Sequence, residues 1–179
     1  GNTAEEIQSN NTANLSATDL TAPTITSVEI GPSNDQLVVE FSEAVYTYKS
    51  TGDEDLRATD FALSITGGTA TLEEATPTSI TKTSQTVWVL GFSTSGTANG
   101  SETITVVPAS STSIYDAAAN AAATSQSNNT SSFNDTTAPT IASTSLNTGN
   151  SELTVTFSEG VYNTTGGTGD LEVDDFALS

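Results

Sequence analysis

Hydrophobic and polar residues alternate in short runs along the chain, and Gly, Asn, Ser and Pro separate these runs. In residues 36–41 the alternation puts Leu37, Val39 and Phe41 on one face, as in a half-buried strand. Residues 86–92 are more continuously apolar, which is typical of a central strand buried on both faces. The pattern predicts seven strands, near residues 24–30, 36–42, 59–65, 69–74, 85–92, 102–108 and 121–133.

Seven short strands separated by turn residues indicate an all-β fold, an antiparallel β-sandwich. Its core is expected to include Trp88, Phe41, Phe61, Val39, Val87 and Leu90. One run, residues 115–123, is rich in alanine, which favours helix. Because the run is short and lies between predicted strands, we expect at most one helical turn there.

The sequence repeats itself with a period of 116 residues. The motif Thr-Ala-Pro-Thr at residues 21–24 recurs at residues 137–140, and in both copies a Phe-Ser-Glu motif begins 20 residues after the first threonine. After a one-residue deletion, Asp-Phe-Ala-Leu-Ser of residues 60–64 returns at residues 175–179. This period suits a whole sandwich domain, because solenoid repeats span only roughly 20–50 residues.

The N-terminus belongs to the same pattern, since Ser-Asn-Asn-Thr at residues 9–12 matches residues 127–130. We therefore expect a complete repeat at residues 19–134, preceded by the tail of another repeat at residues 1–18. Residues 135–179 would then form the first part, about three strands, of the next repeat, and the chain would be a piece of a longer protein. Neither partial repeat can bury a core alone, so we expect neighbouring copies to complete them in a homopolymer or head-to-tail assembly.

The composition narrows the chemistry available to the chain. Asp and Glu number 22 against 3 Lys and Arg, and the formal net charge of −19 disfavours binding to nucleic acid. No stretch approaches the roughly 20 apolar residues of a membrane span, so membrane insertion is not expected. Without His or Cys, the chain lacks thiolate nucleophiles, histidine bases and soft-metal ligands. Calcium, which binds oxygen ligands, is the expected ion.

Several motifs carry a resemblance to a known family. They are an Asp-x-Thr-Ala-Pro entry at Asp19 and Asp135, a Phe-Ser-Glu-x-Val turn at Phe41, an Asp-Phe strand start at Asp60, and a Tyr-Asp-Ala-Ala-Ala-Asn loop at Tyr115. These motifs resemble the immunoglobulin-like tandem repeats of large bacterial surface proteins, which include adhesins and surface-motility proteins. The resemblance implies an immunoglobulin-like sandwich in a protein secreted to the bacterial cell surface. Ala119 stands where the loop of this family has glycine, the residue that most readily adopts a left-handed backbone.

Two functional classes fit such a domain. In one, the repeat is a structural extender of a surface protein or filament. In the other, it is an adhesive module that itself binds a host or surface glycan or protein. Aromatic residues make up only 6% of the chain, which favours the extender. Catalysis is not expected, because acidic loops account for the paired carboxylates without an active site.

The predicted calcium site follows from the order of the strands. In an immunoglobulin-like sandwich, the start of the first strand, the loop after the second and the loop before the last lie at one end. All three segments carry acidic or amide side chains, which would repel one another unless a cation offsets their charge. The predicted ligands are Asp19, Glu43, Asp55, Asp60, Asp116 and Asn120, with Asp135, Glu159 and Asp170 in the next repeat. The alternative is a solvated acidic surface on which Asp60 and Asp175 cap turns.

Overall fold

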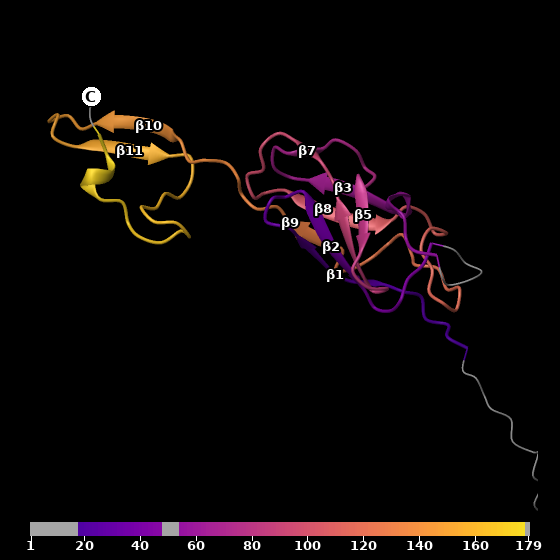
Figure 1. Cartoon of the computed structure of the whole chain (residues 1–179). Helices are drawn as coiled ribbons and strands as arrows, with labels where there is room; N and C mark the ends of the chain where they lie inside the picture. The colour runs from indigo at the N-terminus through magenta and orange to yellow at the C-terminus, as the bar shows by residue number, and fades with distance from the viewer. Residues whose placement is uncertain (1–17, 48–53, 178–179) are drawn as a thin grey trace, which may run out of the picture. The chain divides into compact units, whose positions relative to one another are not determined.

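The computed structural model describes residues 18–47 and 54–177, which fall into two compact units divided between Asn134 and Asp135 (Figure 1). Apart from Thr18, the predicted tail at residues 1–18 lies outside the described residues. All strand pairs in the described part of the chain are antiparallel, and the remaining regular elements are two 3₁₀ turns. None of the described residues form a helix that could cross a membrane.

The first unit is a β-sandwich of two main sheets and a small ribbon. Its strands are β1 (Ile25–Ile30), β2 (Gln36–Phe41), β3 (Phe61–Thr66), β4 (Thr71–Leu72), β5 (Ser79–Lys82), β6 (Val87–Gly91), β7 (Thr94–Ser95), β8 (Thr103–Pro108) and β9 (Thr130–Ser132). One sheet has the strand order β1-β2-β6-β5 and the other β3-β8-β9, while β4 pairs with β7. The 3₁₀ turn η1 (Ala58–Asp60) leads directly into β3. The predicted antiparallel β-sandwich is confirmed.

The core lies between the two main sheets. Strand β2 buries every second residue, as its alternation predicted, and Trp88 on the neighbouring β6 is only 1% exposed. Phe41 of β2 and Phe61 of β3 meet across the sheets with their ring centroids 6.2 Å apart. Of the predicted core, only Val87 is wrong, because it is half-buried and points away from the face that carries Trp88.

The predicted number of strands is also wrong, since the described residues of the first unit form nine strands instead of seven. Strand β5 is a polar edge strand with the sequence Ser-Ile-Thr-Lys. Ile80 is half-buried and the other three residues are exposed. Strand β7 has two residues, too few for any periodicity. Residues 121–133 were predicted to form one strand, but only β9, at Thr130–Ser132, is a strand there. Hydrophobic alternation therefore misses edge strands and very short strands.

The second unit reproduces the start of the first. Strands β10 (Ile141–Leu146) and β11 (Leu153–Phe157) pair in the same register as β1 and β2, and the irregularity after Ile25 recurs after Ile141. The 3₁₀ turn η2 (Val173–Asp175) corresponds to η1. About three strands were predicted here, but the described residues form two. In the first unit, β3 follows η1 and pairs with β8, and the described residues of the second unit include no such partner.

The alanine-rich run at residues 115–123 forms no helix, and only Ala117–Ala118 make a turn. Tyr115 instead forms isolated β-bridges with Tyr46 and Ala121. The backbone N–H and C=O of Tyr46 and Tyr115 bond to each other at 2.8 Å in both directions. This bridge joins the loop after β2 to the loop after β8, which brings the acidic residues of both loops to one end of the unit.

Candidate metal site

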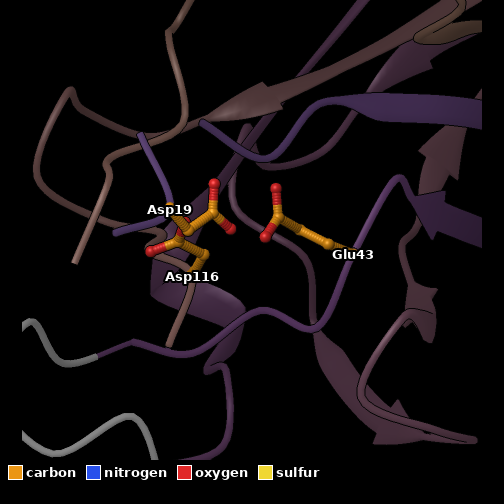
Figure 2. Close-up of side chains that lie close together, drawn as sticks. All are labelled: Asp19, Glu43 and Asp116. Carbon is orange, nitrogen blue, oxygen red and sulfur yellow. The ribbon is translucent and has the colours of Figure 1, made fainter. Parts of the chain in front are cut away.

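Three carboxylates converge at the end of the first unit where β1 begins. Carboxylate oxygens of Asp19, Glu43 and Asp116 all lie within 4.8 Å of one another. Figure 2 shows the Glu43 side chain extending toward Asp19 and Asp116. The three residues come from the segment before β1, the loop after β2 and the loop after β8. The order of the strands predicted that these three segments lie at one end of the sandwich.

Hydrogen bonds hold two of these carboxylates in place. The backbone N–H of Thr21 donates to Asp19 Oδ1 at 2.9 Å, which fixes Asp19 in a short Asx turn. Asn120 donates to Asp116 twice, from its backbone N–H to Oδ1 and from its Nδ2 to Oδ2, both at 2.7 Å. The same Nδ2 donates to the backbone carbonyl of Asp19 at 3.1 Å. Asn120 therefore ties the segment before β1 to the loop that carries Asp116.

The cluster concentrates negative charge. Burial raises the pKa of Glu43, and the negative charges of Asp116 and Asp19 raise it further. Asp116 itself is only 2% exposed. The basic side chains in the described part of the chain are Arg57 and Lys82, and they pair with Glu54 and Asp55 at 2.9 and 2.6 Å. No described ammonium or guanidinium group therefore neutralises the cluster.

The donor set fits calcium. Ca²⁺ takes six to eight oxygen ligands and accepts carboxylates in monodentate or bidentate form. Three carboxylates supply up to six oxygens, and Asn120, whose amide nitrogen donates to Asp116 Oδ2 and to the backbone carbonyl of Asp19, holds two of them in place. A bound divalent cation would offset the repulsion that raises the pKa of Glu43.

The structure places two other predicted ligands away from this cluster. Asp55 pairs with Lys82 on β5. Asp60 is buried and accepts the backbone N–H of Arg57 at 2.7 Å, which closes the 3₁₀ turn η1. Asp60 thus caps a turn, as the alternative interpretation predicted for Asp60 and Asp175. Asp175 caps η2 in the same way, because it accepts the backbone N–H of Glu172 at 2.8 Å.

In the second unit, the structure brings together Asp135 and Glu159, the counterparts of Asp19 and Glu43. Desolvation raises the pKa of Glu159, and the charge of Asp135 and a hydrogen bond with its carboxyl group raise it further. The backbone N–H of Thr137 donates to Asp135 Oδ1 at 2.8 Å, as Thr21 does to Asp19. Asp170 is exposed and does not contribute to the pKa shift of Glu159. The second unit therefore repeats two of the three members of the cluster.

The loop that holds Asp116 contains a strained residue. Ala119 has φ = 70°, a left-handed conformation that costs an L-residue with a Cβ about 1–2 kcal/mol. Replacement by glycine removes this cost but adds conformational entropy to the unfolded chain. We expect Ala119→Gly to raise the free energy of unfolding by about 0.5–1 kcal/mol in urea titrations. Ala118→Gly, at an exposed neighbour without positive φ, should lower it, and stabilisation by both variants would contradict the strain argument.

The sequence did not predict the role of one buried acidic residue, Glu102. Glu102 is fully buried, and its Oε1 accepts backbone N–H groups of Thr69 at 2.7 Å and Ala70 at 3.0 Å. The N–H of Asn99 lies 3.1 Å from Oε2. The loop can close around this side chain because Gly68, at φ = 57°, has no Cβ, which would lie 2.1 Å from the Glu102 carboxyl group. Two successive glycines before Thr69 were the only sequence signal.

The chain matches no protein-family model, no curated protein and no solved structure.

Proposed function

We propose that this chain is a non-catalytic structural extender of a large bacterial surface protein or filament, stiffened by calcium at the junctions between its repeats. The observation that carries the proposal is the cluster of Asp19, Glu43 and Asp116. Asp19 lies in the segment that enters the domain, whereas Glu43 and Asp116 belong to the body of the domain. A cation bound by all three would restrain the entering segment relative to the sandwich.

In the first unit, the distribution of aromatic side chains favours an extender over an adhesive module. Phe41, Phe61, Trp88, Phe92, Tyr115 and Phe133 are all buried in the first unit. Its exposed large hydrophobic residues, among those described, are Leu20 and Val38, neither of which is aromatic. Stacking on a sugar ring needs an exposed aromatic face. Glycan arrays probed with the whole chain test the adhesive alternative, which reproducible binding would favour.

Calcium should stabilise the first unit. A ligand that binds only the folded state adds RT ln(1 + [Ca²⁺]/Kd), about 2.7 kcal/mol at a hundredfold excess over Kd. We expect chelation of calcium to lower the melting temperature measured by calorimetry. Glu43→Gln should remove most of the difference between the calcium and chelator curves, because it takes away one of three ligands.

The matched control is Glu29→Gln, which removes the same charge from the exposed face of β1, the strand that pairs with β2. It should keep the full response to calcium. Melting curves that coincide in calcium and in chelator would rule out the site and leave the acidic loops as a solvated surface. A response that Glu29→Gln reduces as much as Glu43→Gln would indicate nonspecific screening of the net charge.

A further inference from the structure

The sequence contains a single Asn-Gly pair, Asn99-Gly100, which lies in the loop between β7 and β8. In such a pair, the backbone nitrogen of the glycine attacks the side-chain amide carbon of the asparagine with little steric hindrance, because glycine has no Cβ. The succinimide ring that forms opens in water to aspartate or isoaspartate. Asn99 is therefore the asparagine of this chain whose sequence context most favours deamidation.

The folded loop brings the two reacting groups together. Asn99 is exposed, and its Oδ1 accepts the backbone N–H of Ser101 at 3.1 Å. This bond folds the side chain back over the peptide that follows it, which directs Cγ toward the nitrogen of Gly100. Gly100 has φ = 76°, a conformation that glycine adopts readily, so the turn accommodates the pair without strain.

Asn99 also belongs to the hydrogen-bond network of the buried Glu102. Its backbone N–H lies 3.1 Å from Glu102 Oε2, while Oε1 accepts the N–H groups of Thr69 and Ala70 in the loop between β3 and β4. The hydroxyl group of Thr69 donates to the carbonyl of Thr97 at 2.7 Å. The network therefore joins the loop between β3 and β4 to the loop between β7 and β8, and Asn99 is an exposed member of it.

Deamidation changes this network in two ways. It replaces the neutral amide by a carboxylate, which adds a second negative charge to the turn that contains Glu102. Isoaspartate also routes the backbone through Cβ and Cγ of residue 99, which lengthens the chain before Gly100 by one methylene group. Because like charges repel and the longer backbone displaces the turn, both products weaken the hydrogen bonds to Glu102.

We propose that Asn99 is a site of spontaneous deamidation in the folded protein, and that its conversion releases the loop between β3 and β4 from Glu102. The nitrogen of Gly100 forms a bond to Cγ of Asn99, its proton passes to the departing amide group, and ammonia leaves. Water then opens the succinimide. Cleavage between the Gly100 nitrogen and Cγ gives aspartate, and cleavage between that nitrogen and the backbone carbonyl carbon gives isoaspartate.

Water is the sole co-reactant, and nothing is oxidised or reduced. The inference goes beyond the proposed function, since it depends neither on calcium nor on the repeat. It concerns instead how long the first unit keeps these two loops joined.

The first test incubates the whole folded chain in mildly alkaline buffer made with heavy-oxygen water and maps its peptides by mass spectrometry. The label separates conversion during incubation from conversion during digestion. Asn128 is the internal control, because it is exposed in the same unit but is followed by Asn129, whose side chain hinders the attack. We expect label to enter residue 99 at least roughly tenfold faster than residue 128, a barrier difference of about 1.4 kcal/mol.

Hydrogen exchange of the converted protein tests the release of the loop. The amide protons of Thr69 and Ala70 should exchange roughly tenfold faster than in fresh protein, and those of β2 should not change. Asn99→Asp, which reproduces one product, should show the same local effect. Asn99→Ser keeps an oxygen for the N–H of Ser101 but has no amide to lose, so incubation should neither label residue 99 nor alter its exchange.

Label that enters residue 99 no faster than residue 128 would overturn the modification site. Label at residue 99 without faster exchange of Thr69 and Ala70 would overturn the release of the loop. Faster exchange spread equally over β2 would also overturn it, because the whole unit would then have been destabilised. The converted parent chain carries this test even where Asn99→Asp does not fold.

Discussion

Trp88→Ala should lower the free energy of unfolding of the first unit by about 3–5 kcal/mol, the range observed when a large buried aromatic residue is deleted. The Trp88 side chain is 1% exposed and lies on β6, the strand between β2 and β5, with Val39 and Lys82 as its register partners. Its indole N–H reaches the carbonyl of Gln85 at 3.4 Å. Truncation would leave a cavity in the core, against the middle of the larger sheet.

Urea unfolding followed by circular dichroism measures this loss, and Val38→Ala is the matched control. Val38 lies on the adjacent strand but is 39% exposed on the outer face, so its truncation should cost less than about 1 kcal/mol. Trp88 is the sole tryptophan of the chain, so the fluorescence of the folded protein reports on it directly. Emission at the wavelength of a solvated indole, or equal losses in the two variants, would contradict the burial of Trp88.

The sequence predicted the parts of the fold in which side-chain periodicity reflects burial. Strand β2 alternates strictly because one of its faces meets the core, and it was located to within one residue. Strand β5 lies at the edge of its sheet and buries almost nothing, so its sequence carries no such signal. The extent of β9 was overestimated because residues 121–129 form no continuous ladder: backbone bonds at Ala122 and Asn129 stand beside side-chain bonds, such as that from Asn129 Nδ2 to the carbonyl of Val106.

The candidate site was predictable only in part. Strand order places Asp19, Glu43 and Asp116 at one end of a sandwich, and the structure brings these three together. The same reasoning included Asp55 and Asp60, which lie in a loop at that end of the unit. Strand order did not predict that Lys82 pairs with Asp55, because β5 itself had not been predicted. It also did not predict that Asp60 accepts the backbone N–H of Arg57 and so caps η1. Topology assigns a loop to one end of a domain, whereas local hydrogen bonds decide where each carboxylate points.

Glu102 shows how a buried charge can be stabilised without a basic partner. Burial raises its pKa, but hydrogen bonds from the backbone N–H groups of Ala70, Thr69, Asn99 and Glu102 itself outweigh this effect and lower the pKa to about 2. The carboxylate thus joins the loop between β3 and β4 to the start of β8. In the sequence, Glu102 looks like any other acidic residue in a polar loop.

Glu102→Gln should therefore lower the free energy of unfolding at neutral pH by about 2–4 kcal/mol. The charge-assisted hydrogen bonds become weaker, and the amide N–H₂ of glutamine places a donor next to the backbone N–H donors. Since the folded pKa of about 2 lies below the ordinary glutamate pKa of 4.5, the stabilisation by Glu102 is present above pH 4.5 and is lost as the pH falls toward 2. The difference in stability between the parent and the variant should shrink over this window.

Urea titrations of both proteins at a series of pH values between 7 and 2 measure that difference. Contributions from the other carboxylates, including the opposite shift of Glu43, are common to both proteins and cancel in it. Glu74→Gln, which removes the same charge from an exposed position, should differ from the parent by less than about 0.5 kcal/mol throughout. A loss in Glu102→Gln that stays constant down to pH 2 would mean that packing of the side chain, and not its charge, joins the loop to β8.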